Sequence, residues 1–177
     1  MKGGVKLFGV RNMMDNLESL GGNIRRSSRT AILKAGAHLE GKLKRKLSEP
    51  GTGREYRTGK KGSRYRFHRA SAPGQPPAID TGRSRGSITH NITGSPGQTL
   101  PDPGGSKTKV RGYVGTNVDS LYHLERGAMI HPFGNLNILV PLLPRPWMYP
   151  TLEEEAVQVA KIVRDTLQEA INEARMK

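Results

Sequence analysis

The sequence predicts an α+β domain: a small, mostly antiparallel sheet of three or four strands, one long N-terminal helix, and a C-terminal helix packed on one face of the sheet. Three observations predict it. Apolar residues recur every three or four positions over residues 12–47 and again over 151–174, which is the helical period. Alternating residues over 88–92 and 107–116 are typical of strands. The 22 Gly and 12 Pro of the 177 residues leave much of the remainder to loops.

The N-terminal helix is expected to begin at Asn12, which can cap it, and to end before Glu49-Pro50-Gly51. A break is allowed at Gly21-Gly22. We assign residues 1–50 to a helical arm and residues 51–177 to the α+β domain. An assembly arm and a simple core helix explain this pattern equally well. The apolar stripe comprises Met13, Leu17, Leu20, Ile24, Ala31, Ala35, Leu39, Leu43 and Leu47.

A Gly-rich basic loop is predicted over residues 51–70. Arginine interleaved with aromatic residues is what single-strand binders use for phosphate contact and base stacking. It is also the composition of a flexible basic loop that orders when its protein docks on a partner, which is the interpretation we favour. The residues that would face either the assembly or DNA are Arg54, Arg57, Lys60, Lys61, Arg64, Arg66 and Arg69, with Tyr56, Tyr65 and Phe67 among them.

A Pro-rich segment follows, over residues 71–82. Its prolines impose an extended conformation, so we expect a surface loop, closed by a turn at Asp80-Thr81-Gly82 where Gly tolerates a positive φ. Ile88, His90 and Ile92 should then share one face of a strand. This strand is expected to pair with residues 107–116 in antiparallel fashion across the low-complexity segment 94–106.

The C-terminal half should contain a short helix over residues 120–126 that ends at Gly127, and a short strand over 137–141. Thr151 should cap the last helix, since Thr151-Leu152-Glu153-Glu154 matches a capping box. Trp147 should anchor this helix to the sheet. The apolar face of the helix is predicted to comprise Leu152, Ala156, Val159, Val163, Leu167, Ala170 and Ala174.

The formal net charge of +14 is concentrated in the first half of the chain. Residues 1–50 and 51–95 each carry +7, residues 96–150 carry +2, and the last 27 carry −2. Such a field attracts polyanions without sequence preference, so it suits DNA in a channel or an acidic partner protein.

The chain has no Cys, which excludes disulfides and thiolate chemistry, and we expect neither a signal peptide nor a membrane span.

No motif argues for an enzyme. The histidines fall in no zinc-binding spacing, GxSxG and P-loop patterns are absent, and Asp80 and Glu125 are lone carboxylates. His123 and His131 flank Glu125, but we expect surface histidines there rather than a metal site. Glu125 is interpreted as an ion-pair or capping residue, with Arg145 as a candidate partner. We therefore expect no catalytic residue, cofactor or metal.

Three segments in order resemble a known family. They are similar to segments of the tail-completion (head–tail joining, lambda gpZ-type) family of long-tailed bacteriophages. The first is the run ASAPGQPPAIDTGR. The second is Val114-Gly115-Thr116 followed by Tyr122, Leu124, Glu125 and Gly127, and the third is PRPWMYP, which leads into a helix. The resemblance spans about residues 54–175. Two departures concern the sheet: Ser84 and Gly86 stand where a larger apolar residue is expected, and residues 129–143 form a long insert.

The resemblance implies a structural virion protein that completes the tail and joins it to the head. It would form a ring of identical subunits around the DNA passage, six by the symmetry of such tails, and contact neck or tail-tube proteins. It would be assembled in the host cytoplasm, with no membrane partner and only non-specific contact to DNA. A sequence-independent nucleic-acid-binding protein is the alternative. The family-motif residues are Pro73, Gly74, Pro77, Asp80, Thr81, Gly82, Glu125, Gly127, Arg145 and Pro146.

Overall fold

The structure is a computed structural model that describes residues 10–58, 66–78, 80–92 and 109–175. Its elements in chain order are α1 (Val10–Lys46), β1 (Glu55–Thr58), β2 (Arg66–Arg69), α2 (Arg83–Gly86), β3 (Thr89–Ile92), β4 (Gly112–Gly115), α3 (Asp119–Arg126), β5 (Ala128–Ile130), the 3-10 helix η1 (Pro132–Gly134), β6 (Val140–Leu142) and α4 (Met148–Arg175).

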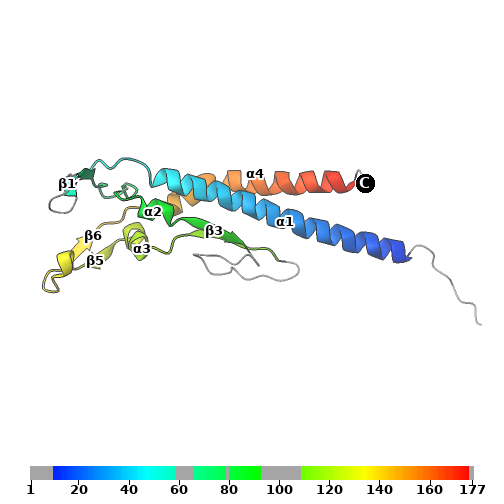
Figure 1. The fold of residues 1–177 in the computed structure, drawn as a ribbon, viewed down its shortest axis with the longest axis horizontal. Coiled ribbons are helices and arrows are strands. Elements are labelled where there is room, and N and C mark those ends of the chain that lie inside the picture. Colours follow the sequence, from blue (N-terminus) through cyan, green and yellow to red (C-terminus); the bar gives the residue numbers. More distant parts are fainter. Residues whose placement is uncertain (1–9, 59–65, 79, 93–108, 176–177) are drawn as a thin grey trace, which may run out of the picture.

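Two long helices, α1 and α4, lie side by side and give the molecule its elongated shape (Figure 1). They run antiparallel: Glu155, near the start of α4, bonds to His38 and Lys42 in the second half of α1. Ile24, nearer the start of α1, instead shares a hollow with Leu167. The predicted α+β class is confirmed, and α1 is continuous through Gly21-Gly22, beginning two residues before the predicted cap.

The strands form three separate two-stranded antiparallel sheets within the described residues, rather than the single sheet predicted. The predicted pairing of β3 with β4 is confirmed, with His90 opposite Val114. Strand β6 begins at Val140, later than predicted, and pairs with β5, which the sequence patterns did not indicate. Helices α2 and α3 and the Pro-rich segment separate the strand pairs in the chain, and of the three pairs it is β3–β4 that packs on α1.

The core lies where the C-terminal end of α1 meets α3 and the start of α4. Trp147 is 1% exposed and is surrounded by Leu43, Leu47, Ile88 and Leu121, all of them buried. Trp147 therefore anchors α4 as predicted. Its partners are mainly helical residues, because α4 packs on α1 rather than across a sheet.

The predicted apolar face of α4 is half-buried from Val159 to Ala174, as expected, but the start of the helix differs from the prediction. Leu152 and Ala156 are exposed, whereas Thr151 and Thr166 are buried and Glu155 is half-buried. Helix α4 begins at Met148, so Thr151 is not its cap; its hydroxyl donates to the carbonyl oxygen of Trp147 at 2.6 Å. The first two turns thus bury polar rather than apolar residues, because the start of the helix is held by polar contacts to other elements.

Two segments predicted as loops have more structure than expected. The predicted basic loop contains the β1–β2 hairpin, in which Arg57 is opposite Phe67. In the Pro-rich segment, Ser71 and Pro77 are buried, so it is not simply a surface loop. The turn region continues into the short helix α2, where extended chain was expected. The predicted low-complexity tip over 94–106 lies outside the described residues.

No helix within the described ranges combines the length and the apolar character needed to span a membrane.

Candidate functional site

Three segments that are far apart in sequence meet at one junction beside Trp147. The backbone N–H of Gly74 donates to the carbonyl oxygen of Pro144 at 2.9 Å. The backbone N–H of Arg145 donates to the carbonyl oxygen of Leu124 at 2.6 Å, and its Nε donates to that of Ser71 at 3.3 Å. These hydrogen bonds tie the Pro-rich segment and the end of α3 to the extended chain that leads into α4. We name this set of contacts the motif junction.

Glu125 is the centre of the motif junction. Its Oε2 accepts hydrogen bonds from the backbone N–H groups of Trp147 at 2.8 Å and Met148 at 3.1 Å, and its Oε1 accepts from Tyr149 at 2.9 Å. The first N–H groups of a helix lack intrahelical partners and carry a partial positive charge, so a carboxylate is well placed there. Of the two roles predicted for Glu125, capping is confirmed. Its candidate ion-pair partner, Arg145, donates to the carbonyl oxygen of Ser71 instead.

The turns that flank the motif junction require glycine. Gly127 ends α3 with φ 78°, and a Cβ there would lie 2.8 Å from the carbonyl oxygen of Leu142. Gly82, before α2, has φ 79°, as the turn signal predicted. Non-glycine residues are disfavoured at such angles, so these two positions constrain the path of the chain around the junction.

A groove of about 510 Å³ runs between α3 and the start of α4. Its lining includes Tyr122, Glu125, Trp147, Tyr149 and Leu152. Both tyrosines are exposed, while Trp147 Nε1 is buried without a hydrogen-bond partner among the described residues. The lining of the groove suits apolar or aromatic groups, since both carboxylate oxygens of Glu125 are already used by backbone N–H groups.

Two carboxylates connect α1 to its neighbours. On α4, Glu155 Oε2 bonds to His38 Nε2 at 2.7 Å and Oε1 accepts from Lys42. On α1, Glu40 Oε2 bonds to His90 Nδ1 of β3 at 2.6 Å, and Oε1 accepts from Lys44. Hydrogen bonds from Lys42 and His38 lower the pKa of Glu155. Burial acts to raise the pKa of Glu40, but hydrogen bonds from Lys44 and His90 outweigh it and the pKa is lowered.

These contacts predict a loss of stability in acid. A carboxyl group whose pKa is lower in the folded than in the unfolded chain stabilises the fold above its ordinary pKa, near 4.5, and the contribution disappears as pH falls through the lowered value. We expect the melting temperature to fall between about pH 5 and pH 3. The Glu40→Gln/Glu155→Gln variant should be less stable at neutral pH and show a shallower fall in acid.

The matched control is Glu153→Gln/Glu154→Gln, which neutralises two exposed carboxylates of α4 that form no ion pair with a described residue. Its melting curves should follow the wild-type pH dependence. Parallel pH profiles for the wild type and the Glu40→Gln/Glu155→Gln variant would contradict the assignment.

The structure places four of the seven predicted basic residues on the β1–β2 hairpin or directly before it. The guanidinium of Arg54 lies 5.6 Å from the ring centre of Tyr56. Arg57 is on β1 and Arg69 on β2, with the backbone of Arg66 at the start of β2. Lys60, Lys61 and Arg64 lie outside the described residues.

The histidines that flank Glu125 are not gathered around it. His131 Nδ1 bonds to the carbonyl oxygen of Ile138 at 2.9 Å, and the ring of His123 packs edge-on against Tyr122. In the described part of the chain, no three His, Asp or Glu side chains come together as metal ligands would. Of the other motif residues, Pro73 and Asp80 are exposed, Pro146 is half-buried, and Thr81 Oγ1 accepts from the N–H of Arg83 at 3.4 Å.

Sequence patterns missed the ion pairs of Glu40 and Glu155. Apart from the Glu40–Lys44 pair within α1, each joins residues 50 or more positions apart, and a single carboxylate on a helix face carries no signal of its long-range partner.

The comparisons with known proteins identify no relative: no family model, no curated protein and no solved structure matches the chain.

Proposed function

We propose that the chain is a structural virion protein of a long-tailed phage or phage-like particle. It completes the tail and joins it to the head as a ring, of six copies by tail symmetry, around the DNA passage. The observation that carries the proposal is the motif junction. The three segments on which the resemblance to tail-completion proteins rests are separate in the sequence, yet the first two both hydrogen-bond to the third, around Glu125 and Arg145.

The exposed surface supports a role in assembly. Among the described residues, eight apolar side chains are buried, whereas fifteen large apolar or aromatic side chains are exposed. Met129, Leu136, Ile138 and Leu139 belong to β5 and the connection to β6, and none of residues 127–144 is Lys, Arg, Asp or Glu. Exposed apolar surface of this kind marks protein–protein contacts. A subunit covered by its neighbours in a particle explains it.

Tailed particles produced without this chain are expected to accumulate as separate heads and tails, and purified chain should restore joined particles counted by electron microscopy. The variant Met129→Ser/Tyr149→Ser removes two apolar groups that are 58% and 69% exposed, so it should melt like the wild type and yet restore joining poorly. Gln158→Ser, at an exposed polar site of α4, is the control. Normal joining in the absence of the chain would refute the proposal.

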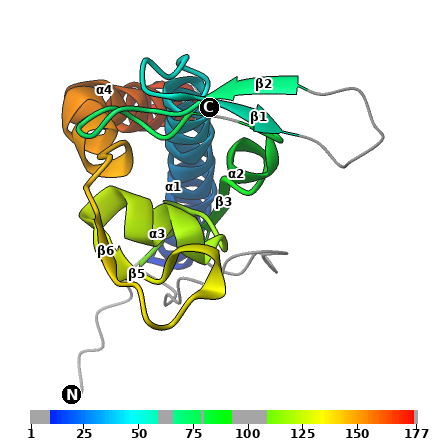
Figure 2. The same cartoon turned by 90° about the vertical axis from the view of Figure 1, so that its left-hand side faces the viewer.

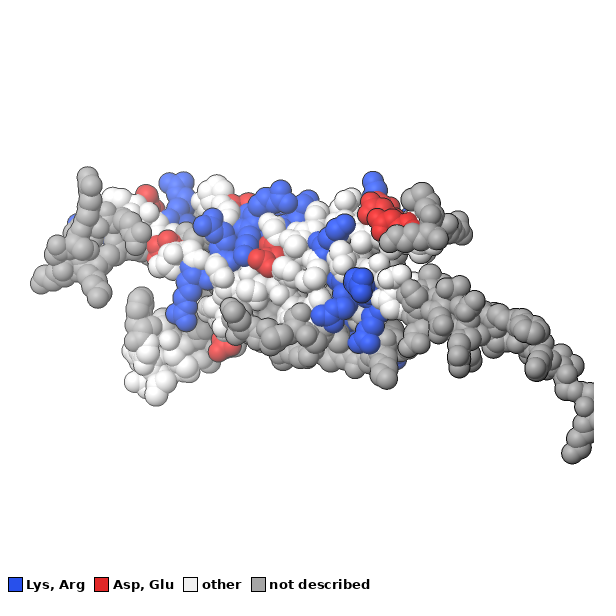
Figure 3. Space-filling view, turned by 45° about the vertical axis from the view of Figure 1, so that its right-hand side comes forward, with Lys and Arg blue, Asp and Glu red and all other residues white. Residues whose placement is uncertain are grey.

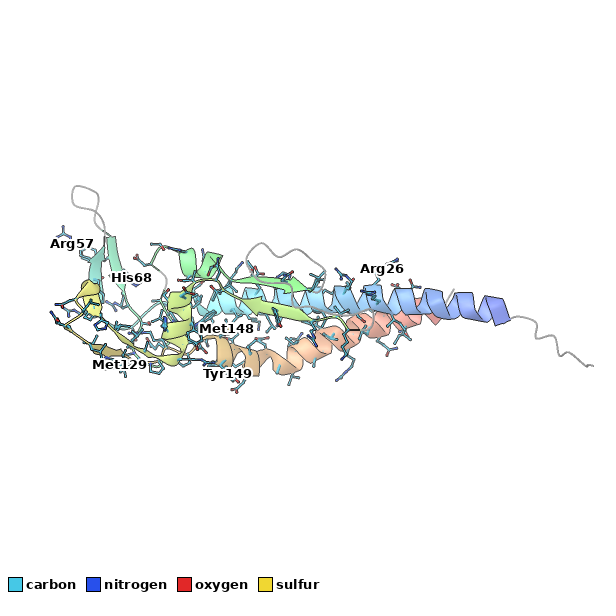
Figure 4. The ribbon with its side chains drawn as sticks, turned by 90° about the horizontal axis from the view of Figure 1, so that it is seen from below. Arg26, Arg57, His68, Met129, Met148 and Tyr149 are labelled. Atoms are coloured by element: carbon cyan, nitrogen blue, oxygen red, sulfur yellow. The ribbon has the colours of Figure 1, made fainter. Side chains whose placement is uncertain are left out.

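A nucleic-acid-binding protein is the second candidate, favoured by the β1–β2 hairpin. This hairpin presents Phe67, which is 71% exposed, opposite Arg57, and Arg54 beside Tyr56. Figure 4 shows Arg57 and His68 at one side of this end of the molecule, with Met129 and Tyr149 toward the other. Cationic and aromatic groups interleaved in this way suit phosphate contact and base stacking.

DNA titration separates the two candidates. For a ring component we expect weak, sequence-independent binding that decreases by orders of magnitude between about 50 and 200 mM salt, since phosphate contacts release counterions. Arg54→Ser/Arg57→Ser/Arg69→Ser should abolish this residual binding and leave particle joining intact. Nanomolar, sequence-dependent binding that persists at the higher salt would instead establish the nucleic-acid function.

A further inference from the structure

The two flanks of the helical layer carry opposite charges. Figure 2 shows α4 on one side of α1, with α2 and the β1–β2 hairpin on the other side. The outward residues of α4 near its start include Glu153 and Glu154, both exposed. The opposite flank has Arg83 and Arg85 of α2, which are also exposed. We name these two arginines the basic corner.

Neither charged group is neutralised by the part of the chain that the structure describes. Neither arginine and neither glutamate forms an ion pair with a described residue. Basic side chains also predominate on the helical part of the face drawn in Figure 3. Unpaired charges of both signs on opposite flanks of one molecule are the arrangement that a head-to-tail contact between identical subunits needs.

The two groups also lie at the same level along the molecule. Glu155, one residue after Glu154, accepts from Lys42, so the start of α4 is level with the last turn of α1. Arg85 Nη1 donates to Ser48 Oγ at 3.4 Å, which places α2 at this same end of α1. A rotation about an axis parallel to the two helices, which keeps every residue at its height, therefore brings the glutamates of one copy toward the basic corner of the next.

An apolar group lies within the acidic surface. Val157 follows Glu153 by one helical turn and is 83% exposed, the largest exposed fraction among the large apolar side chains that the structure describes. Burial of such a side chain favours association, while the surrounding charges determine which surface it meets.

We propose that the outer face of α4 around Glu153, Glu154 and Val157 docks on the basic corner of a second copy of this chain. The contact is heterologous: each copy uses its acidic face toward one neighbour and its basic corner toward the other, so repetition closes a ring. This inference rests on the proposed ring function and names the surfaces that would build it.

Cross-linking tests the contact directly, because the chain has no cysteine of its own. The variant Val157→Cys/Arg85→Cys, treated with a short bis-maleimide, is expected to give a ladder of covalent multimers on a denaturing gel. An equimolar mixture of the two single-cysteine variants should give the mixed dimer. Val157→Cys/Leu136→Cys, whose second cysteine is at an exposed site outside the basic corner, should give no ladder.

Charge reversal tests its polarity, with self-association measured by sedimentation. Glu153→Lys/Glu154→Lys and Arg83→Glu/Arg85→Glu should each weaken association by about 100-fold, because like charges then face each other. The chain that carries all four changes should associate like the wild type. Recovery of the combined variant shows that the acidic face meets the basic corner, and the ladder of multimers distinguishes the head-to-tail contact from a two-fold dimer.

The outcomes are distinguishable from failure of the proposed function. A chain that joins particles but gives no ladder, or whose charge variants associate normally, overturns this contact and leaves the function standing. Charge variants that lose only DNA binding assign the basic corner to nucleic acid and likewise overturn it. The multimers could form as proposed while heads and tails still join in the absence of the chain. That result would refute only the tail-completion role and would leave the contact standing.

Discussion

Replacing Trp147 by Ala is expected to reduce the free energy of unfolding by about 3–5 kcal/mol, the cost of removing a buried large aromatic side chain. Trp147 is 1% exposed and contacts the cluster formed by Leu43, Leu47, Ile88 and Leu121. These residues come from α1, from the chain before β3, and from α3. One substitution therefore weakens the attachment of α4 to all three, and urea unfolding monitored by circular dichroism should show the loss.

Tyr149→Ala is the matched control, since this aromatic residue lies two positions later but is 69% exposed. Its effect on stability should be within about 0.5 kcal/mol of zero. Trp147→Phe should fall between the two, because it keeps most of the buried ring and removes an indole N–H that has no partner among the described residues. Equal midpoints for Trp147→Ala and Tyr149→Ala would show that Trp147 is not the anchor.

The second large effect is expected at Glu125. Glu125→Ala leaves the N–H groups of Trp147, Met148 and Tyr149 without their acceptor, and should cost about 2 kcal/mol. Hydrogen exchange should show where the loss occurs: exchange of these three amides should accelerate more than exchange in the middle of α4.

Glu125→Gln separates charge from hydrogen bonding. The amide keeps one acceptor oxygen, so we expect an intermediate loss of stability and faster exchange at part of the helix start only. Glu154→Ala, at an exposed carboxylate one turn further along α4, should leave those amides unchanged. A uniform acceleration over the whole of α4 in Glu125→Ala would mean that Glu125 acts on the global fold rather than as a cap.

The elements with strong local signals could be predicted from the sequence. Periodic apolar residues located α1 and α4, Gly127 marked the end of α3, and alternation located β3 and its antiparallel partner β4. These signals arise from interactions within a few residues, or from a burial pattern that one element repeats. The β1–β2 hairpin escaped because Arg and Gly dominate its composition, although aromatic residues at Tyr56 and Phe67 were a weak strand signal.

The motif junction was only half visible in the sequence. The sequence predicts that Glu125 either caps or pairs, and its lone position in the last turn of α3 does not reveal which. Its partners are backbone groups 22 to 24 positions later, and backbone N–H groups have no sequence signature. Only the meeting of α3 with the start of α4 selected the cap.

The sequence by itself determined where the longer helices α1, α3 and α4 lie, which strands pair across the low-complexity segment, and where the positive charge is concentrated. The tertiary structure alone decided which residues at the start of α4 are buried. Apolar periodicity favoured Leu152 and Ala156 there, yet Thr151 is buried and Glu155 bonds to α1 instead. The reason is that Glu125 and Trp147 hold the first turn, and His38 and Lys42 on α1 hold Glu155, and these contacts between distant residues outweigh the burial of Leu152 and Ala156.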